Sequence, residues 1–133
     1  MTSATFLCSD QTTEGIRVGA AAFFLAAQSE PEEGHFAFGY RILIKNTGTA
    51  PATLRTRHWD IVDAAGRHET VDGPGVVGQQ PRLEPGQGFT YQSFALLKTE
   101  WGTMEGHYTF ERDDGATFQA PVARFYLVPQ QTA

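Results

Sequence analysis

The sequence predicts an all-β domain, a β-sandwich of about seven to eight antiparallel strands. First, short segments alternate apolar and other residues, as strands with one buried face do. Second, Gly, Pro, Asn and Asp separate these segments at intervals of about eight to twelve residues, a spacing typical of sandwiches. Third, a chain of 133 residues buries enough surface to fold without disulfides. No internal repeat or interdomain linker interrupts the pattern, so a single domain is expected.

The clearest predicted strand covers residues 36–45. Its apolar face carries Phe36, Phe38, Tyr40, Ile42 and Ile44. An earlier segment from Gly15 onward also alternates, although its alanines suit a helix equally well. Other strands are expected at residues 53–59, 67–71, 89–97, 103–111 and 117–128, and a hairpin turn at Asp113-Asp114-Gly115. Residues 1–14 are expected to form a loose leader, 15–128 the domain and 129–133 a tail.

Composition excludes several classes of function. Ten basic and fifteen acidic residues give a net charge of −5, and no basic stretch is interleaved with aromatic residues, so nucleic-acid binding is not expected. The most apolar segment, residues 18–27, is shorter than the roughly twenty residues of a membrane helix. It follows Asp10 and Glu14, whose charge is wrong for a signal peptide. The single cysteine, Cys8, fits a cytoplasmic protein without disulfides.

A series of motifs spans nearly the whole chain. In order they are Ser29-Glu30-Pro31-Glu32, Phe36-x-Phe38-x-Tyr40, Ile42-x-Ile44-x-Asn46, Arg57-His58-Trp59-x-Ile61-x-Asp63-x-x-Gly66, Gly73-x-Gly75-Val76-Val77-Gly78-x-Gln80-Pro81, Leu83-x-Pro85-Gly86, Phe89-x-Tyr91-x-Ser93 and Gly102-Thr103-Met104-x-Gly106-x-Tyr108. With them the chain resembles the ApaG family, also called CorD.

This resemblance implies an immunoglobulin-like or fibronectin-III-like sandwich, with a strand as its first apolar segment. It also implies links with cobalt resistance and magnesium efflux, and use as an interaction module, but no catalytic mechanism. The chain departs from the family pattern at Phe94-Ala95, where many members have Cys-Pro. It departs again at Trp101, where a proline or small residue is common. Both departures enlarge the apolar surface at one edge.

Three glycines, Gly73, Gly75 and Gly78, form a G-x-G-x-x-G. In dinucleotide-binding proteins this spacing joins a strand to a helix, but here prolines and a further strand follow. Two interpretations therefore remain. Either the glycines serve a structural loop, or successive N–H groups bind a phosphate or pyrophosphate, helped by nearby arginines. The candidate phosphate-binding residues are Gly73, Gly75, Gly78, Arg57 and Arg82, with Arg67 a further possible partner.

A second cluster of interest is Arg57-His58-Trp59. Either Trp59 packs into the core, or His58, Trp59, Trp101 and Tyr108 form a partner-binding surface. The four histidines lack a metal-ligand spacing, although His58 and His68 can meet across a hairpin, so neither a metal site nor a cofactor is expected. Neither Ser93 nor Thr103 has a recognisable His and Asp partner, so no catalytic residue is assigned.

The functional expectation is a non-enzymatic, cytoplasmic binding module. Its partner is an unknown protein or a phosphate-bearing small molecule. The alternative is a role in divalent-cation homeostasis through regulation of efflux. Open sheet edges also allow a homo-oligomer.

Overall fold

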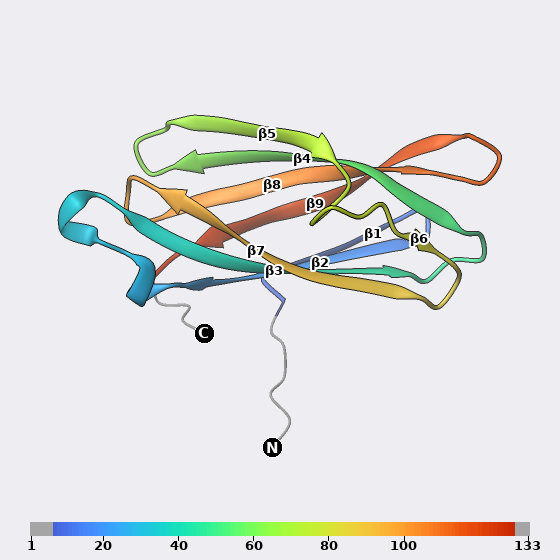
Figure 1. Ribbon diagram of the computed structural model, residues 1–133, viewed down its shortest axis with the longest axis horizontal. Helices are drawn as coiled ribbons and strands as arrows, with labels where there is room; N and C mark the ends of the chain where they lie inside the picture. The colour runs from blue at the N-terminus through green and yellow to red at the C-terminus, as the bar shows by residue number, and fades with distance from the viewer. Residues whose placement is uncertain (1–6, 130–133) are drawn as a thin grey trace, which may run out of the picture.

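The computed structural model describes residues 7–129, which form a β-sandwich with two single-turn 3₁₀ helices (Figure 1). The strands are β1 (Ser9–Thr13), β2 (Ile16–Phe24), β3 (Phe36–Asn46), β4 (Ala52–Asp63), β5 (His68–Pro74), β6 (Arg82–Leu83), β7 (Gly88–Leu97), β8 (Gly102–Glu111) and β9 (Thr117–Leu127). The helical turns are η1 (Ala26–Gln28) and η2 (Pro31–Glu33). The first apolar segment is thus a strand, as the resemblance implies.

Two antiparallel sheets make up the sandwich. One has four strands in the order β1-β2-β3-β7, and the other has five, in the order β5-β4-β8-β9 with β6 paired to β4. The sheets form the lower and upper layers in Figure 1. The predicted all-β sandwich is therefore confirmed. Two strands, β1 and β6, come in addition to those expected.

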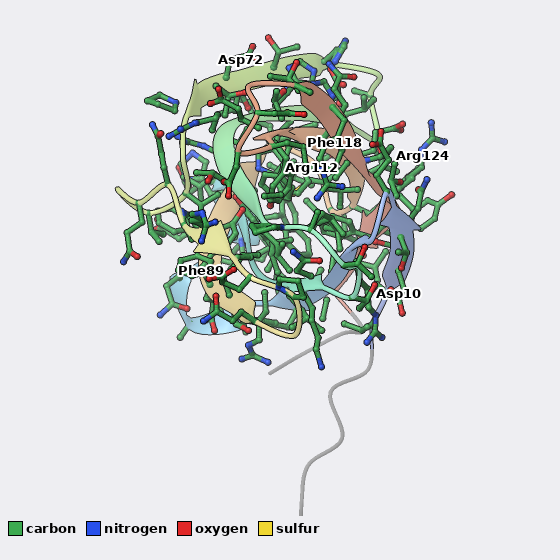
Figure 2. The ribbon with its side chains drawn as sticks, turned by 90° about the vertical axis from the view of Figure 1, so that its right-hand side faces the viewer. Asp10, Asp72, Phe89, Arg112, Phe118 and Arg124 are labelled. Atoms are coloured by element: carbon green, nitrogen blue, oxygen red, sulfur yellow. The ribbon has the colours of Figure 1, made fainter. Side chains whose placement is uncertain are left out.

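The two lateral sides of the sandwich differ. On one side β9 packs against both β1 and β2. Figure 2 looks along the strands and shows Asp10 of β1 and Arg124 of β9 on this side, with Phe89 of β7 on the other. We call the β1/β9 side the closed side and the β5/β7 side, where β5 and β7 are the end strands of their sheets, the open side.

The prediction of a loose leader over residues 1–14 is wrong for residues 9–13. These form β1, which pairs antiparallel with β2 from Ser9↔Ala20 to Thr13↔Ile16. The central residues of β1 are exposed, so they lack the apolar alternation that reveals a strand. Residues 1–6 of the leader and 130–133 of the tail lie outside the described residues.

A β-bulge in β4 sets which side chains face the other sheet. Pairing with β8 shifts between Leu54 and Thr56. Before the shift Ala52 and Leu54 are buried, and after it Trp59 and Ile61 are buried. The extra residue thus moves the inward positions from even to odd numbers. This brings Arg57, two residues before Trp59, to the inner face.

The core lies between the sheets and is rich in aromatic side chains. Trp59 makes edge contacts with Tyr40, Tyr108 and Phe125, with ring centroids 5.5, 6.0 and 6.0 Å apart. Four of the five residues expected on the apolar face of β3 are buried, and Phe36 is half-buried. Within residues 7–129, no helix is long and apolar enough to cross a membrane.

Candidate functional site

The glycine segment is a tight hairpin. Gly75 N–H donates to Arg55 O at 2.7 Å, which holds the start of the turn against β4. Val76 and Gln79 exchange both backbone hydrogen bonds, at 2.8 and 2.9 Å. The two residues between them, Val77 and Gly78, have φ values of 42° and 80°, as in a two-residue type I′ turn. The segment therefore reverses the chain without a helix.

Each glycine of the motif has a structural reason. A Cβ on Gly73 would lie 2.9 Å from the Arg57 guanidinium, and one on Gly75 only 2.2 Å from Gln79 O. Gly78 takes a backbone conformation that favours glycine. The turn also separates two valines, since Val76 is fully buried in the core while Val77 is 57% exposed. The structural interpretation thus accounts for the whole spacing.

The arrangement gives little support to phosphate binding by successive N–H groups. The N–H groups of Gly75, Val76 and Gln79 already donate to carbonyl oxygens of the chain. Arg82 forms ion pairs with Asp113 and Glu84. Arg67 pairs with Asp63 at 3.1 Å. Of the predicted phosphate-binding arginines, only Arg57 lies beside the segment and has no carboxylate partner among the described residues.

Arg57 lies at the mouth of a pocket on the open side. Its Nη1 donates to Pro74 O at 3.0 Å and to Gly75 O at 2.9 Å, so the guanidinium is anchored to the end of β5. The pocket measures about 340 Å³. Besides Arg57 it is lined by Tyr40, Trp59, Ile61, Glu69, Val71, Ser93, Phe94, Ala95 and Leu96.

Three tyrosine hydroxyls lie close enough to Arg57 to feel its charge. Burial raises the pKa of Tyr40, against the lowering effects of a hydrogen bond with Ser93 and of the Arg57 charge. Burial also raises the pKa of Tyr91 and of Tyr108, whose hydroxyls hydrogen-bond to each other between the sheets. These groups stay neutral at physiological pH and keep their protons, so each can act as a hydrogen-bond donor.

The predicted partner-binding residues do not form one surface. Trp59 and Tyr108 are 2% and 0% exposed. The partner-binding prediction is therefore wrong for these two residues. Trp59 packs into the core, which was the alternative interpretation, and Tyr108 lies beside it. His58 lies on the outer face of the five-stranded sheet. Trp101, in the loop between β7 and β8, is 45% exposed and keeps its place as a surface residue.

An apolar surface on β7 was not predicted as a site. Phe94 and Leu96 are two residues apart on the same face of the strand and are 65% and 63% exposed. They line a second pocket of about 370 Å³ on the outer face of the four-stranded sheet, with Leu25, Ala37 and Gly39 among its walls. The sequence held one sign of this surface, the departure from the family pattern at Phe94-Ala95. That departure was expected to enlarge the apolar surface, and the exposure of Phe94 confirms it.

A histidine cluster occupies the outer face of the other sheet. His58 Nδ1 lies 2.6 Å from Asp72 Oδ1, and its Nε2 lies 3.0 Å from Asp60 Oδ2. The other oxygen of Asp60 lies 2.9 Å from His68 Nε2. The sequence allowed His58 and His68 to meet across a hairpin, and in the structure the carboxylate of Asp60 links them across the β4–β5 hairpin. His107 of β8 stacks on His58, with centroids 5.0 Å apart.

The charges of this cluster act in opposite directions on two histidines. The hydrogen bond to Asp72 raises the pKa of His58, against burial and with a further contribution from Asp60. Burial, followed by the charge of His58, lowers the pKa of His107. Within residues 7–129, no group of three or more His, Cys, Asp or Glu side chains is arranged to hold a metal ion. The absence of a native metal site stays a prediction.

Known proteins resemble this chain in sequence and in structure. Residues 26–112 match the family described as ApaG domain. A protein named ApaG from Xanthomonas campestris pv. campestris is 54% identical over 117 residues, which cover 88% of this chain and 92% of that relative. ApaG from Xanthomonas oryzae pv. oryzae is 53% identical with the same coverage.

Solved structures extend the likeness to the whole fold. The crystal structure of a Bordetella pertussis protein described as ApaA has a TM-score of 0.85 and 37% identity, covering 95% of this chain and 99% of that one. A further X-ray structure has a TM-score of 0.82 and 34% identity over 90% of each chain. On sequence and fold together, the chain belongs to the ApaG family.

Proposed function

We propose that this domain is a non-enzymatic binding module that binds an extended segment of a partner protein along β7. The observation that carries the proposal is the pair Phe94 and Leu96. Both are large apolar side chains, more than 60% exposed, on the end strand of a sheet. Isolated exposed apolar residues are common, but two on one strand face beside a pocket form a contiguous patch.

The edge of β7 supplies the second half of the interaction. β7 pairs with β3 on one side, and no other strand of the described chain pairs with its opposite edge. The N–H and C=O groups along that edge are available to an added strand, a common mode of peptide recognition. Backbone pairing would provide affinity, while the pockets beside Phe94 and Leu96 would select side chains.

The side chains of the open side favour binding over catalysis. Ser93, the potential nucleophile that lines the pocket, lies opposite Tyr40 of β3. The histidine cluster lies on the outer face of the opposite sheet and not beside Ser93. A nucleophilic serine needs a base within hydrogen-bond reach, so we propose that the module has no hydrolytic activity. We also propose that the protein is cytoplasmic, because a chain with a single cysteine cannot form the intramolecular disulfides that are typical of secreted proteins.

The proposal is tested with a library of extended peptides and isotope-labelled protein. We expect selected peptides to shift the backbone amide signals of β7. Replacing Phe94 and Leu96 together with serine should weaken binding by at least about tenfold, since central apolar contacts contribute more than about 1.4 kcal/mol. The matched control is Tyr126→Ser, which removes a 51% exposed side chain from β9 and should leave affinity unchanged. Peptides that shift signals only outside β7 would exclude this site.

Two other expectations have less support. A phosphate-bearing ligand at the glycine segment would have to use N–H groups other than those of Gly75, Val76 and Gln79. Amide signals from residues 72–80 that do not move with pyrophosphate or ATP would exclude it. A role in divalent-cation homeostasis predicts heat on titration with cobalt or magnesium. A homo-oligomer through β7 predicts a doubled mass in light scattering, lost in the Phe94 and Leu96 variant.

A further inference from the structure

The side chain of Arg57 is partly buried and forms no ion pair with the described residues. Five other arginines, at positions 17, 55, 67, 82 and 124, form ion pairs with carboxylates. Arg57 forms none among residues 7–129, and neither do Arg41 and Arg112, but each of these two lies over an aromatic ring. Arg57 Nη1 contacts only carbonyl oxygens, and its Nε and Nη2 have no acceptor within that part of the chain. A half-buried cation whose donors are unsatisfied favours an anionic ligand.

The surroundings of Arg57 fit a ligand that accepts several hydrogen bonds. Tyr40 and Ser93, a directly opposed pair on β3 and β7, face Arg57 across the pocket. Both carry hydroxyl groups, and Trp59 and Val71 supply apolar walls. The anchoring of Nη1 fixes the plane of the guanidinium, leaving Nε and Nη2 to donate side by side. This fork matches the two oxygens of a carboxylate.

The charge of the pocket distinguishes a carboxylate from a phosphate. Among the described residues, Arg57 is the only cation that lines it, and Glu69 lines it as well. Arg57 balances the charge of a singly charged carboxylate, whereas a dianionic phosphate would keep one negative charge unbalanced and would be repelled more strongly by Glu69. Phe94 and Leu96 line both this pocket and the one on the outer face. An anion bound at Arg57 therefore lies next to the apolar patch.

We propose that Arg57 binds the side-chain carboxylate of an aspartate or glutamate in the partner segment, whose neighbouring apolar side chains contact Phe94 and Leu96. The inference rests on the proposed function, because the segment must first lie along β7. It adds a rule for the partner: an acidic residue among apolar residues in an extended stretch. The acidic residue gives specificity and the apolar residues give affinity.

The test compares two peptide pools that differ at one position. Both have apolar residues at alternating positions, and one has glutamate where the other has glutamine. We expect the wild-type protein to bind the glutamate pool at least about tenfold more tightly, as charge-assisted hydrogen bonds predict. Arg57→Gln should remove this preference while binding through Phe94 and Leu96 persists. Equal binding of both pools would overturn the inference and leave the proposed function standing. Binding of neither pool would overturn both.

Two further variants guard against loss of folding, because Arg57 also anchors Pro74 and Gly75. Tyr40→Phe and Ser93→Ala leave that anchor in place and should each reduce the glutamate preference severalfold. If neither changes it, the carboxylate does not enter this pocket and the inference fails. A competition experiment distinguishes a carboxylate ligand from a phosphate ligand. Displacement of the glutamate pool by pyrophosphate at concentrations where acetate has no effect would reassign the pocket to phosphate-bearing ligands and overturn carboxylate recognition.

Discussion

The core is covered in different ways on the closed and open sides of the sandwich. On the closed side β9 lies against β1 and β2, so strands of the two sheets touch directly. On the open side β5 and β7 make no contact of comparable extent. There the glycine hairpin inserts the fully buried Val76 into the core, while Arg57 and the pocket occupy the mouth. One side is sealed by strands, the other by a turn.

This difference separates stability from binding. Where strands of the two sheets pack directly against each other, the loss of a buried side chain leaves a cavity in the core. The open side keeps its core covered with Val76 and so leaves Phe94, Leu96 and the donors of Arg57 available to a partner. We therefore expect substitutions at the two sides to affect different measurements.

The largest expected effect comes from the same substitution made on each side. Leu127 of β9 is fully buried, and Leu127→Ala should lower the free energy of unfolding by about 2–5 kcal/mol through the cavity it leaves. Leu96→Ala, on the end strand of the open side, should change it by less than about 0.5 kcal/mol. Chemical denaturation measures both. Similar losses for the two leucines would contradict the division between the sides.

An intermediate effect is expected where the sheets are joined behind the pocket. The hydroxyls of Tyr91 and Tyr108 hydrogen-bond to each other in the core. Tyr108→Phe leaves the Tyr91 hydroxyl without that partner and should cost about 1–3 kcal/mol. In the double variant, with phenylalanine at both positions, no unpaired hydroxyl remains, so part of the loss should return. A double variant as unstable as the sum of the single ones would show that the pair is not coupled.

A gain of stability is expected at the glycine hairpin. Val77 is a β-branched residue at φ 42°, a conformation that is strained for its side chain. Val77→Asn creates the Asn-Gly pair that type I′ turns favour and should stabilise the domain by about 1 kcal/mol. Gly78→Ala, at φ 80°, is the control and should destabilise it. Thermal unfolding decides, and a Val77→Asn variant less stable than the wild type would rule out strain in this turn.

The smallest effect is expected at the histidine cluster and depends on pH. His58 has a raised pKa in the folded state, chiefly because of Asp72. Its contribution to stability is therefore present below its unfolded pKa of about 6.5 and is lost as pH rises through the folded pKa. Asp72→Asn should destabilise the protein at about pH 6 by less than about 1 kcal/mol, because the Asp72 side chain is 68% exposed, and have little effect at about pH 9.

Asp113→Asn is the control for this pH dependence. It removes the ion pair with Arg82, whose hydrogen bond lowers the pKa of Asp113, so its effect should be constant from about pH 6 to pH 9. Denaturation of the wild type and both variants across this range gives the result. A loss at Asp72→Asn that grows with pH would show that the His58 interaction is misassigned.

The alternation of apolar residues predicted the sandwich well because burial follows directly from it. It placed β3 and its inner face. The turn residues Asp113-Asp114-Gly115 placed a hairpin, where Arg112 N–H donates to Ala116 O. It missed β1, whose exposed residues are held by backbone pairing alone. Strand pairing through the main chain leaves no side-chain pattern to detect.

The candidate site was harder to predict because it depends on which way side chains point. Arg57 was singled out, but as a phosphate-binding residue beside the glycine segment and not as part of a pocket with Tyr40 and Ser93. These residues lie on β3, β4 and β7 and meet only through the packing of the two sheets. Likewise the sequence left a surface position open for Trp59 beside a position in the core, and the bulge in β4 directs its side chain into the core.

The bulge at Leu54 and Thr56 also bears on how this strand tolerates changes of length. Deleting Arg55 would remove the extra residue and restore the regular alternation, with Trp59 and Ile61 still on the inner face. A deletion further along β4, with the bulge kept, would exchange the two faces of every residue that follows it in the strand. The strand therefore tolerates the loss of one residue at the bulge and not beyond it. An alignment of relatives should show gaps within β4 at the bulge and nowhere else in the strand.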